Sequence, residues 1–330
     1  MLRWWKIMVY LFLGLGIFIS SGVAVAALLW GVRLKRKYSS PFLHMYPLGH
    51  PMSPLPDMNV VKRLSERIYQ SGVKHIPGVD LRDEDQIKFL NELSPLALEM
   101  PHLTDPEGDY RYSFDNYFFT GTDAILLYSL LRQIKPKRVV EIGSGFSSAL
   151  MLDTAQAHPE IGSEFIFIEP QPERLESLLS DGDKQRCTIL QQYLQDIDLT
   201  FFDRLESGDM IFVDTSHQMK VGSEVLYLIF HVMPRLKKGV LVHFHDVFWP
   251  FEYPKEWVEV GRSWNEAYGL RSFLQYNNEF EICFFNSYMG TVHQKSMEEL
   301  FPWEDGEKSD ASKWPGGNFN AGGSLWIRRK

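Results

Sequence analysis

Apolar runs of four or five residues alternate with stretches of helical periodicity from about residue 121 onward, and this alternation constrains the fold more than any other feature. The strand-like runs lie at 138–142, 165–169, 187–190, 210–214 and 240–244. The helical stretches lie before and between them, near 122–134, 147–157, 172–180 and 220–236. Strands that alternate with helices pair in parallel, so the pattern predicts an α/β protein with a doubly wound, mostly parallel sheet.

Two further strand candidates, residues 281–285 and 324–328, end the chain. No long helix fits tightly between the sheet and the C-terminus, so we expect these two strands to pair antiparallel. The predicted sheet then has seven strands. Open α/β sheets bind ligands at the carboxyl ends of their strands, and polar residues that follow a strand are therefore the candidate site residues.

Residues 7–32 form an uncharged, mostly apolar run. At about 1.5 Å per residue a helix of this length reaches roughly 39 Å, enough to cross a bilayer core of about 30 Å. A cleaved signal peptide is the alternative, since Ala24-Val25-Ala26 fits a cleavage site, but a signal core is normally only about 7–15 residues long. We expect a retained single-pass anchor, followed by a basic flank that favours a cytoplasmic body.

The chain has 330 residues, which allows one large domain or two ordinary ones. We expect four segments: a membrane anchor at 1–37, a proline-rich linker at 38–58, a helical extension at 59–116 and an α/β domain at 117–330. Within the extension, helical patterns lie near 60–71 and 83–94.

Charge and cysteine content exclude several classes of protein. The chain carries 34 basic and 42 acidic residues, but residues 1–37 hold six basic residues and no acid, so the remainder has a net charge of −14. A body this acidic is a poor general binder of nucleic acid, whose phosphates require a basic surface. The only cysteines, Cys187 and Cys283, exclude a disulfide framework and a cysteine-ligated zinc site, and they suit a reducing compartment.

The strongest local signal is a glycine-containing turn after the first strand, where residues 139–148 read Val-Val-Glu-Ile-Gly-Ser-Gly-Phe-Ser-Ser. Glycines let the backbone approach a ligand closely, and a helix N-terminus offers unpaired amide groups. A tight turn without a ligand is the alternative. The position inside a strand–turn–helix unit favours a binding loop. The candidate cofactor-binding residues are Glu141, Gly143, Ser144, Gly145 and Ser147.

An acidic residue, Glu169, follows the next strand. A carboxylate in this position can accept hydrogen bonds from both hydroxyls of a ribose. Together with the turn it predicts a nucleoside-binding site. A nicotinamide-dependent oxidoreductase is the rival interpretation, but Ser148 stands where the third glycine of the dinucleotide-binding pattern is expected, which weakens the case for pyrophosphate.

Polar clusters follow the fourth and fifth strands of the alternating pattern. They read Asp214-Thr215-Ser216-His217 and His243-Phe244-His245-Asp246. With these clusters, residues 117–330 resemble the class I S-adenosylmethionine-dependent methyltransferases, and within them a subgroup with Asp-x-x-His and His-Asp motifs. The resemblance implies a Rossmann-like methyltransferase fold and S-adenosylmethionine as cofactor. It also implies that Glu169 binds the ribose and that Asp214 lies beside the cofactor.

The chemistry of methyl transfer suggests roles for the polar clusters. An aliphatic hydroxyl is a poor nucleophile unless its proton is removed during attack, so we expect Asp214, His217, His245 and Asp246 to be catalytic. Either histidine could be the base, with the aspartates orienting it. Alternatively, Asp214 and Asp246 could hold a divalent metal that acidifies the hydroxyl. We favour the histidine base, because no third carboxylate is evident in the motifs. A purely structural role for all four residues is the remaining alternative.

Aromatic residues crowd the segment 248–268 and predict either a lid that packs on the core or a wall for the acceptor. They are Phe248, Trp249, Phe251, Tyr253, Trp257, Trp264 and Tyr268. The loop 314–318 could complete the wall. Residues before the first strand could flank the cofactor: Tyr117, Thr120, Gly121 and Asp123.

The sequence therefore predicts a membrane-anchored O-methyltransferase that acts on a small hydroxylated molecule or a glycan, without a nucleic-acid partner. A catalytically inactive scaffold at the membrane is the rival from a different class, and the intact polar clusters argue against it. A serine hydrolase is excluded, because the chain has no G-x-S-x-G.

Overall fold

The computed structural model describes residues 30, 49–100, 110–180, 182–300 and 321–330. The chain divides into two compact units, residues 1–65 and 66–330. In the first unit, helix α2 (Met58–Arg63) begins after Asp57, whose side chain accepts a hydrogen bond from the backbone of Asn59. All other elements described below, apart from the start of α3, belong to the second unit.

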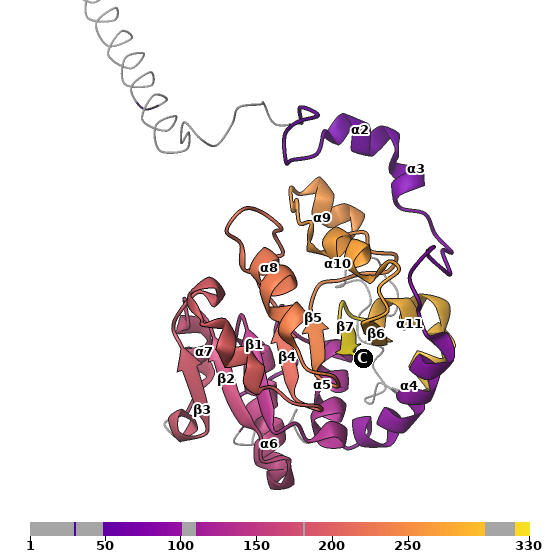
Figure 1. The fold of residues 1–330 in the computed structure, drawn as a ribbon. Coiled ribbons are helices and arrows are strands. Elements are labelled where there is room, and N and C mark those ends of the chain that lie inside the picture. The colour runs from indigo at the N-terminus through magenta and orange to yellow at the C-terminus, as the bar shows by residue number, and fades with distance from the viewer. Residues whose placement is uncertain (1–29, 31–48, 101–109, 181, 301–320) are drawn as a thin grey trace, which may run out of the picture. The chain divides into compact units, whose positions relative to one another are not determined.

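The second unit contains a seven-stranded sheet in the order β3-β2-β1-β4-β5-β7-β6 (Figure 1). Its strands are β1 (Arg138–Ile142), β2 (Glu164–Ile168), β3 (Cys187–Leu190), β4 (Met210–Val213), β5 (Leu241–Phe244), β6 (Phe280–Phe285) and β7 (Leu325–Arg329). The first five pair in parallel, and β7 pairs antiparallel with both β5 and β6. The predicted doubly wound sheet with an antiparallel final pair is confirmed, and each strand end lies within one residue of its expected position.

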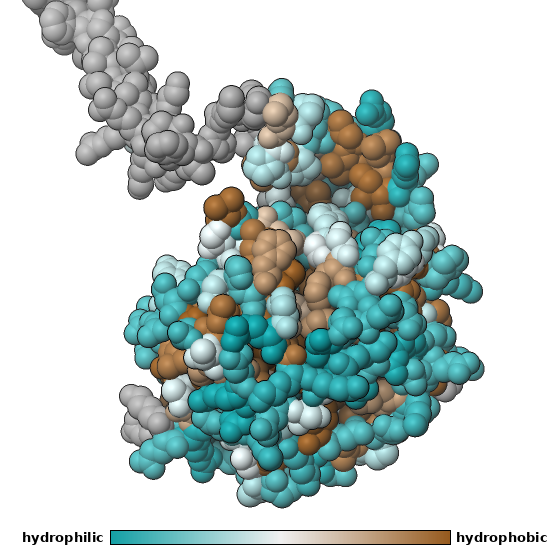
Figure 2. Space-filling view, viewed as in Figure 1, coloured by the Kyte–Doolittle hydropathy of each residue, from teal (hydrophilic) through white to brown (hydrophobic). Residues whose placement is uncertain are grey.

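The strand order reverses between β1 and β4, the place where open α/β sheets bind their ligands. Central strands of such sheets are covered on both faces and read as continuous apolar runs. Every residue of β4 and of β5 is buried, which explains why the alternation of strands and helices could be recognised in the sequence. One connected core joins these strands to the helices. On the face seen in Figure 2, hydrophilic residues predominate and apolar residues form small groups.

The described helices of the second unit connect and pack around the strands of the sheet. Those of eight or more residues are α4 (Asp83–Ala97), α5 (Gly121–Ile134), α6 (Phe146–Ala157) and α10 (Glu266–Leu274). The shorter α-helices of this unit are α7 (Glu173–Leu178), α8 (Glu224–Tyr227), α9 (Lys255–Glu259), α11 (Asn286–Val292) and α12 (Gln294–Leu300). Helix α4 contacts both α5 and β6, so the start of the described second unit packs against the antiparallel edge of the sheet.

Two predicted helices are corrected by the structure. The pattern at 60–71 is divided between α2 and the four-residue α3 (Ser65–Ile68), and neither contains a buried residue whose packing could stabilise a longer helix. The stretch 220–236 is divided into α8, a wide helical turn at Leu228–Val232 and a tight turn at Met233–Arg235. Pro234 has no backbone N–H to donate, so a regular helix cannot continue through it.

The predicted membrane span at 7–32 lies outside the described residues except for Trp30, as do most of the predicted linker and the loop 314–318. Among the described residues, no helix combines the length and the apolar character needed to cross a bilayer.

Candidate active site

The glycine turn lies directly against the end of β4. Gly143 has a φ of +81°, and a Cβ atom placed there would lie 1.8 Å from the backbone oxygen of Asp214. The backbone N–H of Asp214 in turn donates to the oxygen of Ile142 at 3.0 Å. Only glycine allows this close approach, so the turn after β1 and the polar cluster after β4 form one structure.

Glu141 lies beneath the turn and is fully buried. Ser147 Oγ donates to its carboxylate at 2.5 Å, and Ser148 Oγ donates to the other oxygen. Ser148 Oγ also accepts from the N–H of Gly145 at 2.9 Å. Burial raises the pKa of Glu141 to about 8. Glu141 and Ser148 therefore support the turn from below, whereas Gly143, Ser144, Gly145 and Ser147 line the cavity above it.

Glu169 follows β2 and faces the same turn. Its Oε2 accepts from the backbone N–H of Ser144 at 3.1 Å, and its Oε1 accepts from that of Gln171 at 2.9 Å. The side chain lines the cavity. A ribose placed between the turn and this carboxylate could donate both of its hydroxyls to the acid, which is the arrangement expected of a nucleoside site.

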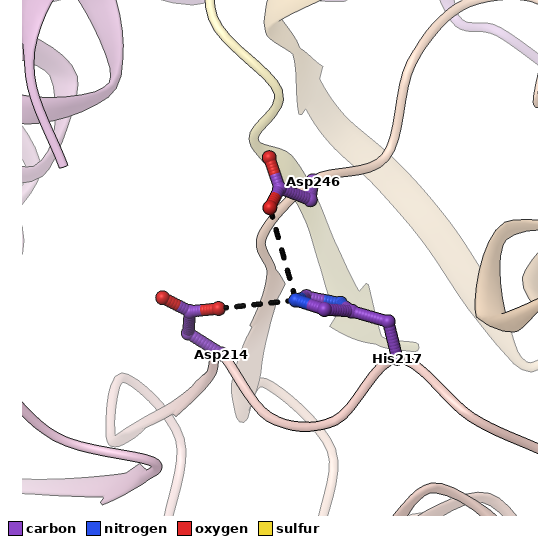
Figure 3. A group of neighbouring side chains, drawn as sticks. All are labelled: Asp214, His217 and Asp246. Carbon is purple, nitrogen blue, oxygen red and sulfur yellow. Dashed lines mark ion pairs between the residues drawn. The ribbon is translucent and has the colours of Figure 1, made fainter. Parts of the chain in front are cut away.

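The polar clusters after β4 and β5 converge (Figure 3). The Nε2 atom of His217 lies 3.4 Å from Oδ1 of Asp214 and 3.8 Å from Oδ2 of Asp246. His217 and Asp246 each adopt a left-handed backbone with a φ of 55°. Such a conformation is costly for a residue with a side chain and occurs often at functional sites. The local backbone is thus bent so that these side chains meet.

Glu266, the first residue of α10, completes this cluster and was not identified from the sequence. Its Oε2 lies 2.9 Å from Nδ1 of His217, and its side chain is buried. The backbone N–H groups of Asn265 and Glu266 both donate to the backbone oxygen of His217. Glu266 follows His217 by 49 residues with no motif linking the two, so only the folded chain reveals the contact.

These carboxylates govern the protonation of the histidines. Burial alone lowers the pKa of His217, but hydrogen bonds to Asp214 and Glu266 outweigh it and raise the pKa to about 10. For His245 burial acts in the same direction, yet the charges of Asp246 and Asp214 raise its pKa well above the ordinary value. The carboxylates therefore favour the protonated form of both rings. A protonated ring must lose its proton before it can act as a base, and the histidine base stays a prediction.

His245 and His243 differ in their surroundings. His245 lies between carboxylates, with Nε2 3.5 Å from Asp123 and Nδ1 3.6 Å from Asp214. His243 is fully buried, stacks on Phe212 at a centroid distance of 3.8 Å and contacts Ser324 Oγ through Nε2 at 2.8 Å. Burial holds the pKa of His243 well below its ordinary value. His243 is therefore a neutral residue of the core.

Asp123, expected to flank the cofactor, also fastens the C-terminal strand. Its carboxylate accepts hydrogen bonds from the backbone N–H groups of Gly323 and Ser324, both at 2.9 Å, and from Asn286 Nδ2 at 2.8 Å. It lines the cavity beside Tyr117 and Thr120. The start of β7 is thereby held next to His245, a role that the local sequence did not reveal.

One cavity of about 790 Å³ joins the turn, Glu169 and the polar cluster. Of the predicted aromatic wall it includes Phe248, Trp257 and Trp264. The other four members are not part of this lining: Trp249, Phe251 and Tyr253 are buried in the core, and Tyr268 is hydrogen-bonded to Glu252. The predicted aromatic wall is therefore divided between the cavity lining and other parts of the molecule.

The donor atoms of Asp214, His217 and Asp246 suit a divalent metal. One ligand atom from each lies within 4.8 Å of the other two. Metal bonds of about 2.1 Å place neighbouring ligand atoms about 3.0–3.4 Å apart, and the spacings of 3.4 and 3.8 Å from His217 Nε2 are close to this range. Glu266 occupies the second ring nitrogen of His217, as carboxylates commonly do for metal-binding histidines. The residues present therefore fit a metal, with His217 joining the two predicted aspartates.

Comparison with known proteins identifies the family. A family model described as a methyltransferase domain matches residues 140–247, which span the turn, Glu169 and both polar clusters. An uncharacterized protein of Archaeoglobus fulgidus is 31% identical over 169 residues, which cover 50% of this chain and 75% of that protein. The chain therefore belongs to the class I S-adenosylmethionine-dependent methyltransferases, and S-adenosylmethionine is the cofactor of this class. The oxidoreductase and scaffold alternatives are not favoured.

Two solved structures of lower sequence identity align with parts of this chain. The methyltransferase PaMTH1 of Podospora anserina, bound to SAH, is 14% identical with a TM-score of 0.39, covering 87% of this chain and 98% of that one. The O-methyltransferase TomG of Streptomyces achromogenes, in complex with SAM, is 19% identical with a TM-score of 0.36, covering 59% of this chain and 81% of its own.

Proposed function

We propose that this protein transfers a methyl group from S-adenosylmethionine to a hydroxyl oxygen of a small hydroxylated acceptor such as a sugar or glycan unit. The observation that carries the proposal is the shared cavity: Asp214, His217 and Asp246 line the same space as Gly143 and Glu169. A hydroxyl reacts with a sulfonium methyl group only if its proton is removed during attack. A cluster of carboxylates and imidazoles beside a nucleoside site suits that requirement.

In this proposal, residues on one side of the point where the strand order reverses bind the cofactor, and residues on the other side bind the acceptor. On the β1–β2 side, the amides of the glycine turn and the carboxylate of Glu169 bind and orient the cofactor. On the β4–β5 side, Asp214, His217 and Asp246 orient the acceptor hydroxyl. Four carboxylates line the cavity, and their negative charge favours a positively charged sulfonium: Asp123, Glu169, Asp214 and Asp246.

We further propose that the cluster works with a divalent cation held by Asp214 Oδ1, His217 Nε2 and Asp246 Oδ2. Such a cation lowers the pKa of a hydroxyl that it contacts. Glu266 keeps Nδ1 of His217 occupied, so that Nε2 faces the carboxylates. Asp214, His217 and Asp246 would hold the cation, which would compensate for the negative charge that develops on the acceptor oxygen. The hydroxyl proton would pass to a neighbouring carboxylate or imidazole of the cluster as the carbon–sulfur bond breaks.

Calorimetry on the full chain tests the cofactor assignment. We expect S-adenosylmethionine and its demethylated product to bind, and NAD not to bind. Replacing Glu169 by Ala removes charged hydrogen bonds and should weaken binding by about 1.5–3 kcal/mol. The matched control is Glu173→Ala, an exposed acid four residues further on. A chain that binds NAD and ignores S-adenosylmethionine would overturn the proposal.

Labelled methyl transfer into a fractionated cell-envelope extract tests the reaction. We expect a labelled methyl ether, loss of labelling with a chelator and its return with Mn²⁺. Asp246→Asn should abolish labelling while cofactor binding persists. Labelling that ignores chelators would remove the cation from the proposal, and labelled nitrogen or sulfur products would contradict oxygen as the acceptor atom.

We also propose that residues 7–32 hold the protein in a membrane with the body on the cytoplasmic side. The support is the uncharged run, whose length suits a bilayer, and the basic residues that follow it, Arg33, Lys35, Arg36 and Lys37. The acceptor would then be a molecule made or carried at the membrane surface.

A further inference from the structure

Arg262 lies at the rim of the cavity in the loop between α9 and α10. Its guanidinium carbon is 4.3 Å from the ring centre of Trp257 and 5.2 Å from that of Trp264. Its backbone N–H donates to the oxygen of Trp257 at 2.9 Å. The guanidinium of this exposed arginine thus lies against two aromatic rings.

No carboxylate pairs with Arg262 in the part of the chain that the structure describes, although four carboxylates line the same cavity. A guanidinium that stacks through its face still presents its N–H donors along its edge. The edge has the shape to bind a carboxylate or a phosphate through two parallel hydrogen bonds. Arg262 is thus a cation beside two aromatic rings whose guanidinium donors find no acceptor among the described residues.

Arg262 belongs to the acceptor side of the cavity. The ring of Trp264 lies 4.2 Å from that of His217, so the arginine is one aromatic ring away from the cluster. The other arginine of the lining, Arg174, lies at the cofactor end. Its guanidinium stacks on Phe118, and its Cδ would lie 3.1 Å from a Cβ placed on Gly145.

We propose that Arg262 binds an oxyanion carried by the acceptor, which is therefore an acidic hydroxylated molecule such as a sugar bearing a carboxylate or a phosphate. The inference rests on the proposed function, because it names the class of substrate for that site. The acceptor hydroxyl would meet Asp214, His217 and Asp246, while its anionic group would lie beyond Trp264 against Arg262. The distance between these two groups on the acceptor would select which hydroxyl is methylated.

A structural role for Arg262 is the competing explanation, in which the arginine only stiffens the loop that carries Trp257 and Trp264. The two explanations differ in one observable. A stiffening role affects neutral and anionic ligands equally, whereas an anion site affects only the anionic ones. Three probes that differ only at C6 separate them: glucose, glucuronate and glucose 6-phosphate.

The experiment measures the binding of these three sugars to the full chain in detergent at low ionic strength, saturated with the demethylated cofactor. The readout is the fluorescence of the cavity tryptophans together with calorimetry. We expect at least one anionic sugar to bind about fivefold or more tighter than glucose, and Arg262→Gln to abolish that preference. Arg262→Lys should keep part of it, because the charge remains but the two parallel hydrogen bonds do not.

Lys255→Gln is the matched control, because it removes the same charge from an exposed position in α9 that does not line the cavity. It should leave the preference unchanged. Whichever anionic sugar binds with the higher affinity shows whether the anionic group of the acceptor is a carboxylate or a phosphate. Equal binding of all three sugars by the wild type, or a preference that survives Arg262→Gln, overturns the inference. Loss of cofactor binding by the wild type would instead refute the proposed function, so the two failures are distinguishable.

Discussion

At the scale of single residues, the cluster depends on Glu266, which contacts His217 and does not itself line the cavity. Its carboxylate fixes which ring nitrogen faces Asp214 and Asp246. Burial raises the pKa of Glu266, and its second oxygen has no hydrogen-bond partner in the described structure. Such a buried acid is retained against a desolvation cost, which is explained if its partner must stay oriented.

The orienting role of Glu266 leads to the first prediction. Glu266→Gln keeps the shape of the side chain but weakens the bond to Nδ1 of His217. We expect the affinity for Mn²⁺, measured by calorimetry, to fall about 10–100-fold, with cofactor binding unchanged. Glu252→Gln is the control, since Glu252 contacts Tyr268 and not the cluster. Equal Mn²⁺ affinity in all three proteins would contradict an orienting role.

The second prediction concerns Glu141 and the pH dependence of stability. Burial raises its pKa in the folded protein to about 8, from an ordinary value of 4.5 in the unfolded chain. Between these values the folded chain keeps a proton that the unfolded chain has lost. This contribution to stability is therefore complete below the unfolded pKa and is lost as the pH rises through the folded one. The slope is at most about 1.4 kcal/mol per pH unit.

Glu141→Gln carries no such proton and should lack this part of the pH dependence. Denaturant unfolding at several pH values between 5 and 9 measures it. We expect the wild type to lose stability relative to the variant as the pH rises, whereas the exposed Glu173→Gln should follow the wild type. A constant difference between wild type and Glu141→Gln across this range would show that the carboxyl is ionised throughout.

At the scale of elements, the contact between the glycine turn and the end of β4 fixes the geometry of the site. The turn reaches β4 because Gly143 lacks a side chain and has a positive φ. Gly143→Ala should therefore destabilise the protein by about 1–3 kcal/mol and weaken cofactor binding. Gly162→Ala is the matched control: its φ is +57° and nothing lies within 4 Å of its added Cβ. The control has the backbone strain without the clash.

Thermal unfolding and calorimetry compare the two alanine variants. We expect Gly162→Ala to lose stability by about 1 kcal/mol and to bind cofactor normally. If Gly143→Ala behaves in the same way, the close approach to Asp214 does not govern the site.

The elements also mark how far the sequence can predict this molecule. The sheet was predictable because its central strands are buried on both faces and are therefore mostly apolar runs. The convergence of His217 with Asp246 was predictable because carboxyl ends of neighbouring parallel strands meet at one edge. Glu266 and the second role of Asp123 depend on contacts between distant segments, which leave no local pattern. The prediction of one helix at 220–236 was wrong, because Pro234 interrupts an otherwise helical stretch.

At the scale of the whole molecule, charge is distributed unevenly along the chain. The first 37 residues carry six basic residues and no acid, whereas the remainder has a net charge of −14. A basic terminal segment attracts an anionic membrane surface, and an acidic body is repelled by it. The proline-rich residues 38–58 suit a spacer that keeps the acidic body away from the lipid. This charge pattern is the reason that the attachment we propose runs through the N-terminal run and not through the body.

The last prediction tests this attachment. Residues 7–32 should remain on the mature protein, and the chain should fractionate with membranes even after washing at high salt or alkaline pH. A lysine in the middle of the run costs about 2.5–3.5 kcal/mol on insertion, so Ile17→Lys should shift the protein towards the soluble fraction, whereas Ile17→Phe should not. Mass spectrometry of the N-terminus distinguishes retention from cleavage, which would give a new terminus near Ala27. Protease added to sealed right-side-out vesicles should leave the body intact, and its digestion there would reverse the proposed orientation.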